Sequence, residues 1–225
     1  MKAENNKAKY SFVEKCMNKL RHSKLYNNSF TCSLRRKKLN NTDFTIISNN
    51  CWGGICYEFF GLKKLSPTVG CYFFSSDYLK FVGNLRHYLS QKLVIISAKE
   101  SVHYESLLNK NETNVPVGRL DDIEVVFLHY RNADDAVEKW NRRCKRINWN
   151  NLIIKYSNMN EASQDDVKLF LNLEILNSKK LCFLNYTPNQ FKKDVLIVVS
   201  HILKMKKTCL MIRFIGKSSL TYINF

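Results

Sequence analysis

Apolar residues recur along this chain with two different spacings, and the two spacings alternate. Short apolar runs rich in Ile, Val and Phe are typical of buried strands. The runs that predict strands lie at residues 44–47, 92–97, 123–130, 151–158 and 179–187. Apolar residues three and four positions apart predict amphipathic helices. The helices predicted in this way span residues 52–62, 75–91, 132–148 and 163–176.

Strands that alternate with helices are typical of an α/β fold. Nearly continuous apolar strands favour a mainly parallel sheet with helices on both faces, a Rossmann-like three-layer arrangement. The length of 225 residues suits one domain with an appended segment. We expect residues 43–225 to form a single α/β domain. The pattern is ambiguous from about residue 191, although residues 208–215 would suit a late strand.

Polar residues mark the predicted starts of three helices and the polar side of the helix 132–148. Serines at the starts of 75–91 and 163–176, and Asn132, are residue types that cap helix N-termini. In 132–148 the apolar stripe predicted to be buried consists of Val137, Trp140, Cys144 and Ile147. The basic residues predicted to cover the rest of that helix are Lys139, Arg142, Arg143, Lys145 and Arg146.

Residues 1–42 are interpreted as a basic N-terminal helix and connector. Within 11–21 one helical face is apolar, and its members are Phe12, Val13, Cys16, Met17 and Leu20. Residues 1–38 carry eight Lys and three Arg against two Glu, a net charge of +9. Two interpretations stay open: the helix packs on its own domain, or it lies on a membrane surface.

The formal net charge of +17 predicts attraction to polyanions. Nucleic acid is disfavoured as a partner because no zinc finger, RNP-like motif or regular arginine spacing is present. An anionic membrane surface and phosphorylated substrates remain. The first residues lack the apolar core of a signal peptide, and the run 195–203 falls short of the roughly 20 residues that span a bilayer. We therefore expect a cytoplasmic protein, with a peripheral position at the inner face of the membrane as an alternative.

Eight cysteines are present, but none has CxxC spacing and no histidine cluster accompanies them. Because the spacing and the histidines of a zinc site are both missing, no zinc site is predicted. In a cytoplasmic chain the cysteines are expected to be reduced. No motif indicates a tightly bound cofactor, and nothing in the sequence indicates an oligomeric state.

Polar residues follow the predicted strands, and these residues form the candidate site. The residues expected to converge are Asn49, Asn50, Cys51, His129 and Asn158. Ligands of open α/β sheets bind outside the carboxyl ends of parallel strands, which meet at one edge. The sequence therefore predicts a binding site at that edge.

The segment "SNNCWGG", residues 48–54, places Cys51 at a strand-to-helix turn, where a helix N-terminus stabilises a thiolate. Gly53 and Gly54 would let backbone N–H groups approach an oxyanion or a phosphate. His129 is the candidate base for the thiol, and Trp52 is a candidate for stacking on a sugar. Anion binding without covalent chemistry and a packed corner are the alternatives.

Four segments, "SNNCWGG", "SPTVG", "GRLDDIEVVFLHY" and "KWNRRCKRINW", resemble the bacterial DUF1919 family over roughly residues 43–190. Members are often labelled exopolysaccharide or capsule biosynthesis proteins, and their activity is not established. They tend to carry a "TDRDG"-like segment where this chain has "SNMNEASQDD", so a carboxylate role at that edge is not carried over to this chain. The resemblance implies surface-glycan assembly, with a glycan or a lipid- or nucleotide-linked sugar as partner.

Two hypotheses follow. The first is a transferase that modifies a surface polysaccharide or its precursor, with acyl transfer through Cys51 and His129. The second is a non-catalytic glycan- or phosphate-binding accessory module of the polysaccharide assembly machinery. A reactive cysteine is needed only by the first.

Overall fold

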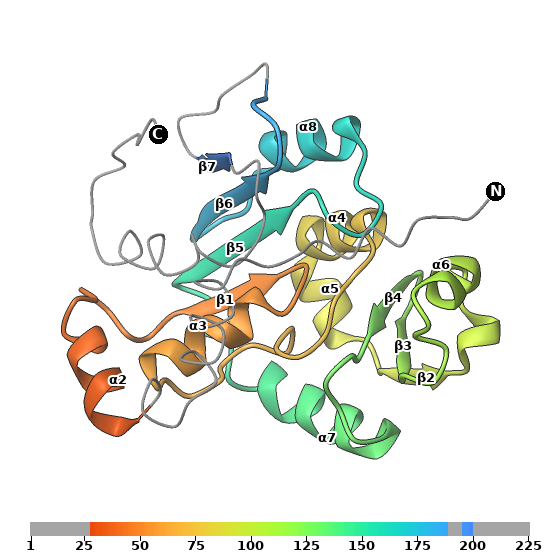
Figure 1. Ribbon diagram of the computed structural model, residues 1–225, viewed down its shortest axis with the longest axis horizontal. Helices are drawn as coiled ribbons and strands as arrows, with labels where there is room; N and C mark the ends of the chain where they lie inside the picture. The colour runs from red at the N-terminus through yellow and green to blue at the C-terminus, as the bar shows by residue number, and fades with distance from the viewer. Residues whose placement is uncertain (1–27, 189–194, 200–225) are drawn as a thin grey trace, which may run out of the picture.

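The computed structural model describes residues 28–188 and 195–199, and its centre is a four-stranded sheet (Figure 1). The strands of this sheet are β1 (Thr45–Ser48), β5 (Leu152–Ser157), β6 (Ser178–Leu184) and β7 (Val195–Val199). They follow the order β1-β5-β6-β7, and every neighbouring pair is parallel. The predicted mixed α/β fold with a mainly parallel sheet is confirmed; the Rossmann-like three-layer arrangement stays a prediction.

A second sheet holds the remaining strands of the described residues, and here the prediction was wrong. The strands are β2 (Val94–Ile96), β3 (Val117–Leu120) and β4 (Ile123–Val126), paired antiparallel in the order β2-β3-β4. Only Asp121 and Asp122 separate β3 from β4, and Asp121 has φ 56°. A two-residue connection can join only antiparallel strands. Residues 92–97 and 123–130 therefore contribute to a small sheet of their own, which includes the unpredicted β3.

The helices largely follow the predicted ranges. Within these ranges lie α3 (Trp52–Phe60), α4 (Ser75–Gly83), α5 (Leu85–Ser90), α7 (Ala133–Cys144) and α8 (Gln164–Asn172). Two further elements were not predicted, namely α6 (Tyr104–Asn109) and a 3₁₀ turn at Ala98–Glu100. The predicted helix 75–91 is interrupted at Asn84, whose φ of −139° is not helical. Asn132 and Ser163 cap α7 and α8 as predicted. Ser75 does not cap α4, because Phe74 takes that position.

Successive residues of the parallel strands pack into two different apolar clusters. Ile46 belongs with Tyr57 and Phe60 of α3. Ile47, one position later, belongs with Tyr78 of α4 and with residues of α7 and α8. This alternation is the two-residue period of a strand that is buried on both faces. The alternation fixes the face of β1 on which each residue lies, and with it the position of the residues that follow the strand.

Residues predicted as a connector contain a helix, α2 (Ser29–Arg36), which packs on α3. Arg35 and Arg36 donate to the carbonyl oxygens of Phe59 and Phe60 at 3.0 and 2.8 Å. These contacts satisfy carbonyl groups at the end of α3 that lack intrahelical partners. The helix predicted at 11–21 and the strand predicted at 208–215 lie outside the described residues, and the domain boundary at residue 42 stays a prediction.

Candidate functional site

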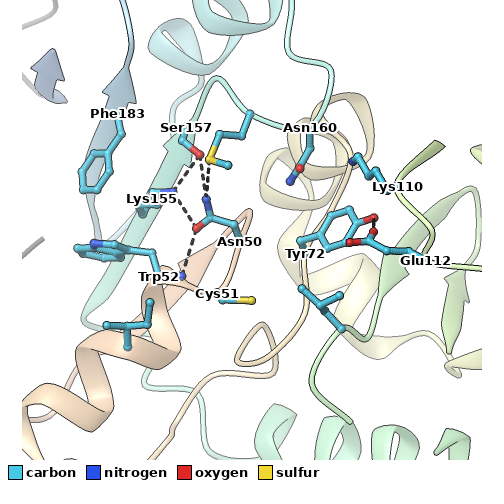
Figure 2. A pocket seen from close by; sticks show the side chains of 13 residues that line it. Asn50, Cys51, Trp52, Tyr72, Lys110, Glu112, Lys155, Ser157, Asn160 and Phe183 are labelled. Atoms are coloured by element: carbon cyan, nitrogen blue, oxygen red, sulfur yellow. Dashed lines mark hydrogen bonds between the residues drawn. The ribbon is translucent and has the colours of Figure 1, made fainter. Parts of the chain in front are cut away.

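A cavity of about 420 Å³ lies where β1 and β5 end, between these strand ends and residues of the loops that carry Tyr72 and Glu112 (Figure 2). One wall carries Asn50, Lys155 and Ser157, from the ends of β1 and β5. The opposite wall carries Tyr72 and Glu112. The predicted site at the carboxyl ends of parallel strands thus has a counterpart in the fold, although several of its residues differ from those predicted.

Lys155 is the most unusual residue of this cavity, because its side chain is only 1% exposed. Its Nζ donates to Asn50 Oδ1 and Ser157 Oγ at 3.0 Å each, and to Asn49 Oδ1 at 3.3 Å. It also lies 5.0 Å from the ring centroid of Phe183. All three donor positions of the ammonium group are therefore satisfied by neutral oxygen atoms.

No carboxylate among residues 28–188 and 195–199 forms an ion pair with Lys155. Burial lowers the pKa of Lys155 to about 7, because an ammonium group without a counter-ion is costly in a low-dielectric interior. The ammonium form is therefore disfavoured at this position relative to a lysine in water. Buried ionisable groups with shifted pKa values in a cavity are typical of functional sites.

Asn49 and Asn50 hold this lysine in place. Asn49 is fully buried, and its amide donates to the Ser157 carbonyl at 2.8 Å. It contacts Lys155 and Ser157 and does not line the cavity, so its position suits a residue that orients Lys155. Asn50 does line the cavity, and its Oδ1 also accepts from the Trp52 amide at 3.2 Å.

The opposite wall pairs a carboxylate with a phenol. Tyr72 donates to Glu112 Oε2 at 2.5 Å. The pKa of Tyr72 is raised, chiefly by burial and to a lesser extent by this hydrogen bond. Two backbone hydrogen bonds of 2.9 Å join Tyr72 to Val126 and so attach this wall to the small sheet. Lys110 lies over the Tyr72 ring at 4.9 Å. The cavity therefore presents a carboxylate opposite a buried lysine (Figure 2).

Cys51 lies at the edge of this cavity, but its thiol is not activated. Burial raises the pKa of Cys51, an effect that outweighs the opposing influence of Lys155. The Sγ atom contacts the Cys71 carbonyl oxygen at 3.9 Å. The six cysteines among the described residues are all free. Burial therefore disfavours the thiolate form that the predicted nucleophilic role requires.

The prediction placed His129 at the end of a parallel strand. In the structure it follows β4, an antiparallel strand of the small sheet. Its backbone N–H donates to the Gly70 carbonyl at 3.0 Å. Cys51 and His129 line a common second cavity, yet within the described part of the chain no hydrogen bond joins their side chains. The structure thus brings the two residues into one region without forming a nucleophile–base pair.

Gly53 and Gly54 are buried and serve close packing. A Cβ atom on Gly53 would lie 3.1 Å from Ile46 Cγ2, and one on Gly54 would lie 3.1 Å from Val69 Cγ1. The glycine pair therefore lets α3 approach β1 and the segment around Val69. This packing explains why both positions lack a side chain; Gly54 also lines the second cavity, and the backbone contact predicted for a ligand stays a prediction.

Trp52 and Asn158 complete the predicted set. Trp52 lines the first cavity, is 7% exposed and meets Phe183 edge-on at 5.2 Å, so little of its ring is free to stack on a sugar. Asn158 points elsewhere, because its amide donates to Asn185 Oδ1 at 2.6 Å. Asn160, two residues later, lines the cavity in its place.

The predictions missed Lys155 and Glu112. Lys155 had a signal, because it is the only charged residue in the apolar run 151–158 and a lysine is rarely buried without a partner. Glu112 had none, since it lies in a turn after α6 and reaches the cavity only through the position of the small sheet.

Two further kinds of feature, a membrane span and a metal centre, concern residues 28–188 and 195–199. No helix there has the length and apolar character required to cross a bilayer. No group of three or more His, Cys, Asp and Glu side chains in that part of the chain is placed to hold a metal ion.

Comparison with known proteins extends the resemblance noted from the sequence. An uncharacterized protein of Haemophilus influenzae is 31% identical over 142 residues, which cover 63% of this chain and 63% of that protein. The chain thus spans less than two thirds of that relative's length. The family described as "Domain of unknown function (DUF1919)" matches residues 11–224, nearly the whole chain. By this match, the chain belongs to the DUF1919 family.

Proposed function

We propose that this protein is a transferase of surface-polysaccharide assembly that binds a phosphate-activated sugar in the cavity at the ends of β1 and β5. The glycan setting is carried over from the labels of the proteins that the sequence resembles. The substrate class rests on one observation of the site, namely the buried Lys155 with no carboxylate partner among the described residues.

An anionic substrate group would supply the counter-charge that Lys155 lacks. Coulomb attraction is stronger in a poorly solvated cavity than in water, and it would raise the pKa of the lysine toward full protonation. Asn50 and Asn160 add amide groups to the cavity lining, which suit the hydroxyl groups of a sugar. The lining thus combines a cation for a phosphate with hydrogen-bonding groups for a glycan.

Glu112 is the candidate general base, because it lies across the cavity from Lys155. Its carboxylate would take the proton of an acceptor hydroxyl while that oxygen bonds to the anomeric carbon of the donor. The bond from this carbon to the phosphate oxygen breaks, and its electron pair stays on the phosphate. Lys155 would stabilise the charge that develops there.

This assignment moves the chemistry away from Cys51. A thiol whose pKa is raised and which has no bonded base is a poor nucleophile. Acyl transfer through Cys51 would require an activation that the site does not provide.

Isothermal titration with UDP-glucose, GDP-mannose and farnesyl diphosphate, at about 0.15 M salt to screen surface charge, tests the binding step. We expect at least one compound to bind, and Lys155→Met to weaken it by about tenfold or more, equivalent to about 1.4 kcal/mol. Lys99→Met, at an exposed lysine, is the matched control and should change affinity less than twofold. Binding of none of the three, or equal binding by Lys155→Met, would contradict the proposal.

Cellular glycan analysis then separates the enzyme from the non-catalytic accessory module. In a strain that encodes the protein, Glu112→Gln should abolish one glycan linkage, seen by mass spectrometry, while the purified variant still binds the sugar compound. Cys51→Ala should keep that linkage. An unchanged glycan structure in the Glu112→Gln strain would favour the accessory module, and loss of the linkage in Cys51→Ala would restore acyl transfer through the thiol.

A further inference from the structure

A second cavity of about 440 Å³ adjoins the first, since both are lined by Cys51 and Ile55. The charged side chains that line it are Glu58, Lys64, Lys139 and Arg143, with His129 and Tyr130 between them. The lining residues come from α3, the segment between α3 and α4, the segment after β4, and α7. The proposed function makes no use of this cavity.

Arg143 is the residue on which the charge and the hydrogen-bonding capacity of the second cavity chiefly depend. The sequence pattern placed it on the solvent-exposed face of α7, but it is only 8% exposed. Its Nη1 donates to the Val69 carbonyl at 3.0 Å and to the Tyr130 hydroxyl at 2.6 Å. An arginine carries five N–H donors. Those on Nη2 and Nε have no acceptor among the residues that the structure describes.

The charges around Arg143 do not balance. Glu58 is paired with Lys64 at 2.7 Å, and Asp135 beside the cavity is paired with Lys139 at 2.7 Å. Each carboxylate near the cavity thus already has its own lysine. Arg143 is left as a buried cation without a carboxylate, over residues 28–188 and 195–199. A buried charge is costly unless a partner compensates it.

We propose that the second cavity binds an oxyanion, a phosphate or carboxylate group, with the Arg143 guanidinium as its anchor. A planar guanidinium with free N–H groups matches two oxygen atoms of one anion. Lys139 and His129 lie on the same lining and add donors. The shared wall at Cys51 and Ile55 means that a ligand here and a sugar in the first cavity would lie next to each other. Only this last consequence, two neighbouring substrates, rests on the proposed function.

Titration calorimetry with pyrophosphate and with glucuronate, on the full chain at about 0.15 M salt, tests the site and distinguishes the two oxyanions. We expect one of them to bind, and Arg143→Gln to weaken it by about tenfold or more. Arg142→Gln is the control, because Arg142 is the exposed neighbour paired with Glu138. It should change affinity less than twofold. Equal losses in the two variants would mean general charge attraction and would overturn the site.

Arg143→Gln also removes two internal hydrogen bonds, so a second variant covers the case in which it fails to fold. Lys139→Gln changes a partly exposed lysine and leaves Asp135 unpaired beside the cavity. It should weaken pyrophosphate or glucuronate binding at least fivefold, and unchanged binding would contradict the proposal. Lys155→Met separates the two cavities. If it abolishes all oxyanion binding while Arg143→Gln does not, the proposed function stands and the second site falls.

Discussion

Two buried lysines on neighbouring strands show how differently one residue type can be used. The Nζ of Lys180 donates to the carbonyl oxygens of Leu171 and Leu173 at 3.1 and 2.7 Å, at the end of α8. A cation there compensates the partial negative charge of a helix C-terminus, so Lys180 has a structural explanation. Lys155 contacts only neutral side chains and lines a cavity. At the residue scale, this contrast is why we assign function to Lys155.

The lowered pKa of Lys155 predicts how the free energy of unfolding depends on pH. Its pKa is about 7 in the folded protein, below the ordinary value of 10.5, so the unfolded chain binds the proton more tightly. On this account, stability rises with pH between about 7 and 10.5. We expect wild type to gain stability relative to Lys155→Met from about pH 7 to about pH 9, measured by urea unfolding. A constant difference over that range would show that the lysine titrates normally.

At the scale of single elements, glycines decide how α3 begins and ends. Gly53 and Gly54 permit its close contact with β1 and Val69. Gly61 ends the helix in the left-handed region, with φ 59°, and its N–H donates to the Glu58 carbonyl. A left-handed C-cap is the usual way in which glycine ends a helix. The sequence shows the glycines, but only the packing reveals which contacts require them.

A pair of glycine substitutions tests this distinction. Gly61→Ala should lower the free energy of unfolding by about 1–2 kcal/mol or more, because its Cβ would lie 2.8 Å from Cys32 Cβ in a left-handed conformation. Gly83→Ala, at the end of α4, meets nothing closer than Leu173 Cδ2 at 3.7 Å. It should be neutral or stabilising by up to about 1 kcal/mol. Chemical denaturation of both variants provides the comparison, and similar losses would refute the packing argument.

At the scale of the whole molecule, the two sheets share one apolar core. The largest cluster contains Ile154 of β5 together with Ile123 of β4. Trp140 of α7 is 1% exposed and packs against Phe81 and Phe127, with ring centroids 6.3 and 5.8 Å away. One wall of the first cavity follows β1 and β5, and the other carries Tyr72, which is hydrogen-bonded to Val126 of β4, so the shared core also holds the two walls in position.

Replacement of Trp140 tests whether the sheets unfold together. Trp140→Ala should cost about 3–5 kcal/mol of unfolding free energy, as for large buried aromatic residues. Fluorescence and circular dichroism should still report one transition. Trp149→Ala, at a half-buried position, should cost less. Two separate transitions, in wild type or variant, would mean that the small sheet is an independent unit.

The sequence alone located most elements around the parallel sheet and led to the edge at which the first cavity lies. Apolar periodicity located β1, β5, β6, α3, α7 and α8, because each element buries a face with its own spacing. The rule that ligands bind at the carboxyl ends of parallel strands led to Asn50 and Cys51, both of which line the cavity. Apolar spacing suffices to locate these elements because it depends on residues that are close together in the sequence.

The tertiary structure decided which side chains meet, because those contacts join residues far apart in the chain. Pairing of β3 with β4 in a separate sheet places His129 after an antiparallel strand, where it lines the second cavity with Cys51. Glu112 lies opposite Lys155 across the first cavity. Packing of α7 buries Arg143, which its periodicity placed in solvent. Burial and the lack of a counter-charge give the two cations their significance, and neither property can be read from a residue and its neighbours in sequence.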